Sequence, residues 1–83
     1  MKLDILYFAW VRERVGCSKE TVETNAATVS DLVGELLMQD EGYVAAFADL
    51  SVIRVAVNQE LCELKTPLKN AYEVAFFPPM TGG

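Results

Sequence analysis

The sequence predicts an α+β domain in which a mixed sheet of about five strands carries one main helix on one face. Three observations support this prediction. The chain has 83 residues, enough for a single small domain. Short stretches of alternating apolar residues occur near both ends, and one strong helical stripe lies between them. One helix can cover the apolar side of all these strands, which leaves the other side of the sheet open.

The first element is expected to be a strand formed by KLDILYF, residues 2–8. Alternation puts Leu3, Ile5 and Tyr7 toward the helix and leaves Leu6 and Phe8 on the open side. The following AWVRERVG breaks the alternation and ends at a glycine, which indicates a turn of helix or an irregular loop. Next, KETVET is rich in Thr and Val and fits a short second strand paired with the first.

The clearest helix is TVSDLVGELLMQD, residues 28–40. Thr28 can cap its first turn, and Asp31 lies where a carboxylate favours the positive end of the helix dipole. The apolar stripe that faces the sheet is Val29, Leu32, Val33, Leu36 and Leu37. Gly34 interrupts this helix and is interpreted as a point of close packing on the sheet. The next segment, EGYVAAFADL, is expected to be either a frayed helix or a compact loop.

The second half of the chain adds three strands. SVIRVAVN alternates well, and a turn at Asn58–Gln59 leads to a short strand over Leu61–Glu63. TPLKNAY is typical of a loop. In the final stretch, YEVAFF, Val74 and Phe76 face inward and Phe77 faces outward. Outward aromatic residues beside a terminus are more typical of a docking surface than of scattered surface residues.

The composition excludes several function classes. Lys and Arg number 7 against 12 Asp and Glu, for a net charge of −5, which argues against nucleic-acid binding. The acidic excess suits a basic partner surface or serves solubility alone. Without histidine, a Ser/His or Cys/His catalytic pair is excluded, and the two cysteines are too few for a zinc site. Cys17 and Cys62 are expected to be free thiols in a reducing cytosol.

Neither a signal peptide nor a membrane span is predicted. Asp4 interrupts the first apolar stretch, and the longest apolar run, Ile5–Val11, is far too short to cross a bilayer. We therefore expect a cytoplasmic protein.

The chain ends in FFPPMTGG, which suggests a stiff base followed by a slender reactive tip. Pro78 and Pro79 favour extended backbone, so residues 78–83 can project by about 20 Å from the domain formed by residues 1–77. Gly82 and Gly83 carry no side chain, so they can enter a narrow channel and leave the terminal carboxylate open to attack.

Several motifs spread over the chain point to one family. They are FFPPMTGG with EVA before it, VNQ at 57–59, PL at 67–68, and the spaced residues Phe8, Ala9, Arg12, Glu13 and Gly16. With the predicted order of elements, they resemble the ubiquitin-like β-grasp proteins and, more narrowly, the small sulfur-carrier subunits of molybdopterin synthase. Two positions depart from the family pattern: Asn70-Ala71-Tyr72 replaces a Gly-Asp turn, and Met80 replaces a smaller aliphatic residue.

The resemblance implies a function in molybdenum cofactor biosynthesis. An E1-like adenylating enzyme would activate the Gly83 carboxylate with ATP, and a sulfur donor would convert it to a thiocarboxylate. The large synthase subunit would then receive the tail and pass the sulfur to a pterin precursor. The chain itself would be no enzyme and would bind no metal or cofactor, and two carriers would flank a dimer of large subunits.

The resemblance also assigns the site residues. Gly83 is the reacting terminus and Gly82 gives clearance for it. The residues expected to contact partners are Phe8, Leu61, Phe77, Pro78, Pro79, Met80 and Thr81. Alternation independently puts Phe8 and Phe77 on the open side, whereas Leu61 is placed only by the resemblance.

Two other functions remain open at the level of sequence. The same tail would serve a sulfur carrier for thiamine or tRNA thiolation, or a modifier attached to protein lysines. Alternatively, the chain is a plain interaction module whose terminal glycines are idle. The Phe-Phe-Pro-Pro lead-in favours the molybdopterin pathway.

Overall fold

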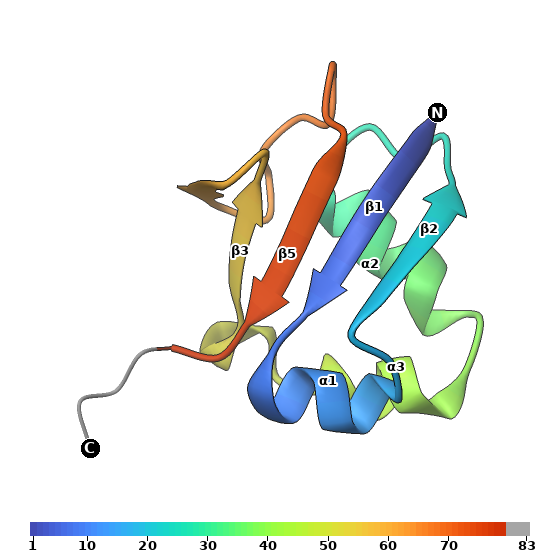
Figure 1. Cartoon of the computed structure of the whole chain (residues 1–83), viewed down its shortest axis with the longest axis vertical. Helices are drawn as coiled ribbons and strands as arrows, with labels where there is room; N and C mark the ends of the chain where they lie inside the picture. The colour runs from blue at the N-terminus through green and yellow to red at the C-terminus, as the bar shows by residue number, and fades with distance from the viewer. Residues whose placement is uncertain (80–83) are drawn as a thin grey trace.

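The computed structural model describes residues 1–79, which form one five-stranded sheet with helices packed against it (Figure 1). The elements are β1 (Lys2–Tyr7), α1 (Ala9–Val15), β2 (Lys19–Glu23), α2 (Val29–Leu37), α3 (Glu41–Ala46), the 3₁₀ helix η1 (Leu50–Val52), β3 (Arg54–Val57), β4 (Glu60–Cys62) and β5 (Glu73–Phe77). In these residues, every helix is too short or too polar to cross a membrane.

The sheet is mixed, as predicted, with strand order β2-β1-β5-β3-β4. The central strands β1 and β5 are parallel, and the other neighbouring pairs are antiparallel. Because β1 and β5 run in the same direction, β5 ends at the edge of the sheet where β1 leads into α1 (Figure 1). Pro78 and Pro79, which follow β5, therefore lie near α1.

The core lies between the sheet and α2, which is behind the sheet in Figure 1. Leu3, Ile5 and Tyr7 are at most 1% exposed, and Val74 and Phe76 are completely buried, so the predicted faces of the first and last strands are confirmed. The Phe47 ring packs edge-on against Phe76, with ring centroids 4.9 Å apart. We call the side of the sheet away from α2 the open face.

Helix α2 begins where its cap predicts. The Thr28 hydroxyl accepts a hydrogen bond of 3.1 Å from the Asp31 backbone N–H. The first four residues of the predicted stripe are buried, but Leu37 is 36% exposed, because the helix ends there. The interpretation of Gly34 is wrong, since a Cβ at this position would meet no atom within 4 Å.

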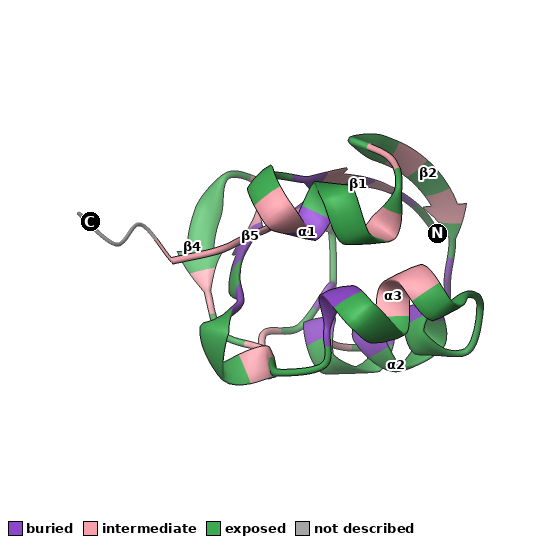
Figure 2. Ribbon diagram, turned by 90° about the horizontal axis from the view of Figure 1, so that it is seen from below, coloured by how far each residue is buried: buried purple, intermediate pink, exposed green. Residues whose placement is uncertain are grey.

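The two segments for which helix and loop both remained open contain short helices, α1 and α3, beside the main helix α2. Ala9, with φ of 52°, turns the chain from β1 into α1, and Gly16, with φ of 99°, ends that helix. Helix α3 is capped by Asp40, whose carboxylate accepts a hydrogen bond of 3.1 Å from Gly42 N–H. Seen from the end where the tail leaves, α1 lies on the sheet side of the interior and α3 lies beside α2 (Figure 2).

The turn between β3 and β4 is confirmed at Asn58–Gln59. Both residues have positive φ, 51° and 71°, as a type I′ hairpin turn requires. The Asn58 side-chain oxygen also accepts hydrogen bonds from the backbone N–H groups of Tyr72, at 2.9 Å, and Glu73, at 3.1 Å. This residue therefore ties the hairpin to the loop that enters β5.

Two strand boundaries differ from the prediction. The start of SVIRVAVN belongs to η1, and β3 begins only at Arg54. β4 covers Glu60–Cys62, one residue earlier than expected, because the tight turn at 58–59 allows pairing to resume at once.

Candidate docking face and tail exit

Strand β5 carries the chain to the point where the predicted tail begins. It ends at Phe77, and the half-buried Pro78 and Pro79 follow it at the edge of the sheet occupied by α1 (Figure 1). Met80, Thr81, Gly82 and Gly83 lie outside the described residues. The structure therefore places the base of the tail.

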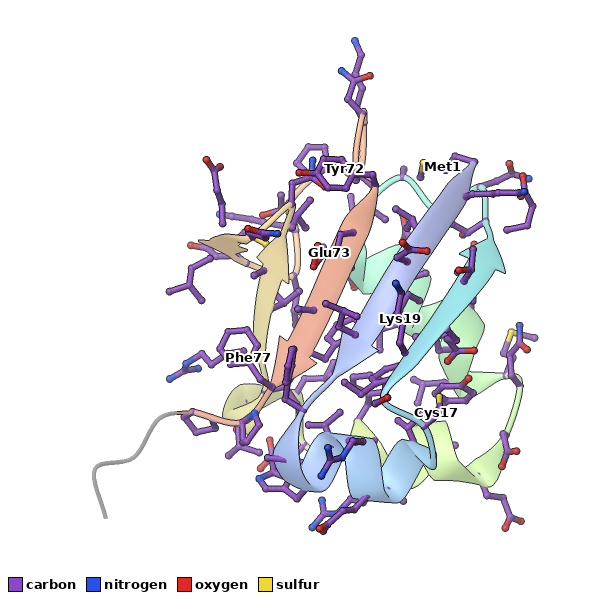
Figure 3. The ribbon with its side chains drawn as sticks, in the orientation of Figure 1. Met1, Cys17, Lys19, Tyr72, Glu73 and Phe77 are labelled. Carbon is purple, nitrogen blue, oxygen red and sulfur yellow. The ribbon has the colours of Figure 1, made fainter. Side chains whose placement is uncertain are left out.

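The aromatic residues predicted to dock a partner come together at this base. Tyr7 pairs with Phe76 in the parallel β1–β5 ladder, and the next N–H, of Phe8, donates to the Phe76 carbonyl at 3.1 Å. Phe8 keeps extended backbone, so it continues the alternation and is 48% exposed on the open face. Phe77 lies on the same side of the neighbouring strand, about 5 Å away by strand spacing. Figure 3 labels Phe77 at the tail end of β5.

Leu61 lies farther away, on the edge strand β4, and is 73% exposed. The register connects it to the centre of the sheet, because Leu61 pairs with Ala56, Ala56 with Ala75, and Ala75 with Leu6. The predicted docking residues thus belong to one surface, which we call the apolar band. It consists of Leu6, Phe8, Ala56, Leu61, Ala75 and Phe77. Alternation could assign Leu6 and Ala75 to the open face, but only the register shows that they connect Leu61 to Phe77.

The remainder of the open face is polar. Asp4 accepts a hydrogen bond of 2.7 Å from the Thr21 hydroxyl and lies 3.9 Å from the Lys19 amine. Glu73 pairs with Asp4 in the β1–β5 register and lies in the half of β5 that is remote from the tail (Figure 3). The open face is therefore divided, with its apolar part next to the tail exit.

Behind the sheet, a carboxylate network joins β1, β2 and α3. One oxygen of Glu20 accepts hydrogen bonds from the hydroxyls of Tyr7, at 2.7 Å, and Tyr43, at 2.5 Å. Burial raises the pKa of both phenols well above the ordinary tyrosine value, and the bond to the Glu20 carboxylate raises it further. These groups are held in their protonated form and serve structure.

The half-buried Cys17 thiol is not activated as a nucleophile. Burial raises its pKa, and the nearby Glu20 charge adds to this effect. Because the thiolate is the reactive form of cysteine, a raised pKa makes the side chain less reactive at neutral pH. Among residues 1–79, no group of three or more His, Cys, Asp or Glu side chains is placed to hold a metal ion. The described residues thus form a docking surface beside the base of the tail.

Comparison with known proteins relates this arrangement to a family. The model of the ThiS family matches residues 5–83. Proteins from Haemophilus influenzae and Escherichia coli, each named molybdopterin synthase sulfur carrier subunit, are 40% identical to the chain over 81 residues. Both alignments cover 98% of this chain and 99% of the relative.

Solved structures show the same fold. SAMP1 from Haloferax volcanii superimposes with a TM-score of 0.75 at 26% identity, with all of both chains covered. A molybdopterin converting factor subunit 1 from Pyrococcus furiosus gives 0.75 at 28% identity, covering 96% of this chain and 99% of that one. A complex of subunits 1 and 2 of the molybdopterin-converting factor from Helicobacter pylori contains a chain that matches with a TM-score of 0.66 at 26% identity, with full coverage of both. The ubiquitin-like β-grasp fold is thereby confirmed.

Proposed function

The chain belongs to the ThiS family, and from this membership we propose that it is the sulfur carrier subunit of a molybdopterin synthase. The observation that carries the proposal is the meeting of two features at one edge of the sheet. The base of the tail, Pro78–Pro79, directly follows Phe77, which belongs to the apolar band. A partner that covers this band is positioned to receive whatever chain follows.

The reaction takes place at the end of the tail, for which Gly83 supplies the carboxylate. A carboxylate oxygen attacks the α-phosphate of ATP, pyrophosphate leaves, and an acyl-adenylate forms. A sulfur donor at the sulfide oxidation level then attacks the carbonyl carbon, AMP leaves, and a thiocarboxylate remains. Its sulfur is a good nucleophile at neutral pH and bonds to a carbon of the pterin precursor, from which an oxygen leaving group departs. Water then hydrolyses the resulting thioester, which leaves the sulfur on the pterin and returns the carboxylate.

The roles of partners follow from this chemistry. An E1-like enzyme supplies the ATP site, a separate donor supplies sulfur, and the large synthase subunit supplies the groups that act on the pterin. The carrier provides a folded body, residues 1–77, and a reactive tail, residues 78–83, with no metal or cofactor of its own. We place it in the cytoplasm, in a heterotetramer with two carriers on a dimer of large subunits.

The structure of the H. pylori complex supports the pairing with a large subunit. It contains a chain of this fold together with subunit 2 of a molybdopterin-converting factor. In our proposal, Phe8, Leu61 and Phe77 contact the body of the large subunit. Pro78, Pro79, Met80 and Thr81 line the entrance to its active site, and Gly82 gives clearance inside it.

A mass measurement tests the first half of the cycle. The carrier is incubated with its adenylating enzyme, ATP and a sulfide source, and the intact chain is weighed. We expect a gain equal to the mass difference between one sulfur and one oxygen, located on the C-terminal peptide. A variant with one tryptophan added after Gly83 serves as control and should gain nothing, because its carboxylate no longer fits the activating site. An unchanged mass for the natural chain would contradict every hypothesis in which the chain is a sulfur carrier.

The acceptor is tested separately, because carriers for thiamine or tRNA thiolation would pass the first experiment. The thiocarboxylated chain is mixed with the large synthase subunit and the cyclic pterin precursor. We expect a dithiolene pterin to form. We also expect the mass of the carrier to fall by the difference between one sulfur and one oxygen. Retention of the sulfur by the carrier would point to a different acceptor.

A further inference from the structure

Arg54 has an unusual place on the open face. It is the first residue of β3, it is exposed, and its register partner in the β3–β5 ladder is Phe77. Residues paired across two strands project from the same side of a sheet. The guanidinium of Arg54 therefore emerges beside the aromatic residue that precedes the tail.

The acidic groups nearest to Arg54 along the chain or across the ladder are engaged elsewhere. The Asp49 carboxylate accepts hydrogen bonds from the backbone N–H of Ser51, at 3.0 Å, and from its hydroxyl, at 2.5 Å. Glu63, which follows β4, pairs with Lys65 at 3.4 Å. Within residues 1–79 the ion pairs involve the N-terminus, Lys19 and Lys65, and none involves an arginine.

Arg54 resembles Lys2, Arg12 and Lys69 in having no ion pair or aromatic contact among residues 1–79, but it alone of these four has Phe77 as its register partner. The Arg14 guanidinium lies over the Trp10 ring, 4.3 Å from its centroid. Lys19 also borders the apolar band, because its register partner is Leu6, but it is paired with Asp4. Arg54 borders the apolar band and, among residues 1–79, has no carboxylate or aromatic ring as a partner. The chain has a net charge of −5, so the positive charge of Arg54 at the docking surface is opposite in sign to the charge of the molecule as a whole.

Such a group restricts which protein can cover the band. A surface that buries Phe77 also removes water from the adjacent guanidinium, and an unpaired charge is costly to desolvate. A carboxylate opposite Arg54 removes this cost and can form a bidentate pair with the planar guanidinium. Charges at the rim of an interface determine partner choice and association rate more than total affinity.

We infer that the large synthase subunit presents an Asp or Glu side chain to Arg54 where it covers Phe77, and that this ion pair selects and orients the partner. The inference rests on the proposed function, because it concerns the same docking step. It assigns Arg54 a positioning role in partner recognition, separate from the chemistry at the tail.

The experiment compares two charge reversals with equal effects on net charge. Arg54→Glu changes the proposed contact. Lys69→Glu is the matched control, because Lys69 is exposed in the loop that enters β5, at the end of the sheet opposite the tail (Figure 1). Association rate and Kd for the cognate large subunit are measured at low and high salt, and the thermal unfolding midpoint checks that both variants are folded.

We expect Arg54→Glu to weaken binding about tenfold at low salt, mainly through slower association, with a smaller difference at high salt. Lys69→Glu should change Kd less than about twofold. Arg54→Lys should lie between the natural chain and Arg54→Glu, because it keeps the charge but loses the bidentate geometry. A substitution of one acidic residue by lysine on the large subunit should restore binding of the Arg54→Glu variant.

Equal effects of Arg54→Glu and Lys69→Glu would overturn the inference, because net charge alone would then explain them. Unchanged binding of Arg54→Glu would overturn it as well. Both outcomes leave the proposed function intact, provided that the natural chain binds the large subunit and acquires sulfur at Gly83. If the natural chain binds no large subunit at all, the proposed function fails, and the inference fails with it.

Discussion

At the scale of the single residue, Glu20 shows how one carboxylate can hold three elements together. It belongs to β2, and its two hydrogen-bond donors are Tyr7 at the end of β1 and Tyr43 on α3. Tyr7 is only 1% exposed, so its hydroxyl needs this partner to be buried without penalty. Burial raises the pKa of Tyr7, and the hydrogen bond to the Glu20 carboxylate raises it further.

This contact predicts a loss of stability at alkaline pH. In the unfolded chain Tyr7 loses its proton near pH 10, whereas in the folded protein the raised pKa keeps it protonated. The unfolded state therefore binds fewer protons above pH 10, and the free energy of unfolding should fall there by up to about 1.4 kcal/mol per pH unit. Below pH 10 the Tyr7 phenol makes its full contribution to the free energy of unfolding. Urea unfolding measured from pH 8 to pH 11 tests the slope.

Tyr7→Phe provides the control for this pH dependence. It should cost about 1–3 kcal/mol at pH 7, because a hydrogen bond to a charged group is lost. Above pH 10 its stability should fall less steeply than that of the natural chain, because the Tyr7 phenol is gone and, of this pair of phenols, only Tyr43 still contributes. Parallel stability curves for the two proteins over pH 8–11 would show that Tyr7 is not responsible.

The sequence predicted which way single residues of the site face, but not which residues lie next to one another. Alternation correctly predicted that Phe77 faces outward and Phe76 inward, because the period of a strand is fixed. It could not show that Arg54 stands opposite Phe77 or that Leu61 reaches the same surface. Those relations depend on the register of three strands, which the tight turn at Asn58–Gln59 and long-range packing determine together.

At the scale of the element, the contact between α1 and α3 depends on one glycine. A Cβ added at Gly42 would lie 2.8 Å from the Arg14 carbonyl oxygen and 3.2 Å from that of Val15. Gly42→Ala should therefore push α3 away from the end of α1 and destabilise the protein by about 1–3 kcal/mol, despite the better helix propensity of alanine. Gly34→Ala in α2 is the matched control.

The control should change stability in the opposite direction. Since nothing lies within 4 Å of a Cβ at Gly34, alanine there should stabilise the protein by up to about 1 kcal/mol through propensity alone. Urea unfolding of both variants measures the two changes. The packing explanation is wrong if Gly42→Ala is as stable as Gly34→Ala.

The elements differed in how well the sequence predicted them. The strands were predictable from their alternating burial pattern, and α2 was predictable from its apolar stripe and its Thr28 cap. α1 and α3 contain only seven and six residues, so their helical period is barely sampled, and their stability comes from packing against each other. η1 was missed for the same reason, because one turn of 3₁₀ helix has no sequence period of its own.

At the scale of the whole molecule, the two sides of the sheet have separate tasks. The side toward α2 holds the core, and the open face carries the apolar band at the end where the chain leaves (Figure 1). The parallel pairing of β1 and β5 makes this possible, since it brings Phe8 and Phe77 to the same edge. The fold thus places the docking surface and the base of the tail together.

Two neighbouring phenylalanines on β5 test this division of tasks. Phe76→Ala removes a completely buried ring and should destabilise the domain by about 3–5 kcal/mol. Phe77→Ala should change the free energy of unfolding by less than about 1 kcal/mol but weaken binding to the large synthase subunit by about 2 kcal/mol or more, because it removes an aromatic anchor of the interface. Urea unfolding and calorimetric titration with the large subunit give the two quantities. If Phe77→Ala unfolded the domain as readily as Phe76→Ala, Phe77 would belong to the core, and the partner would have to approach the tail from another side.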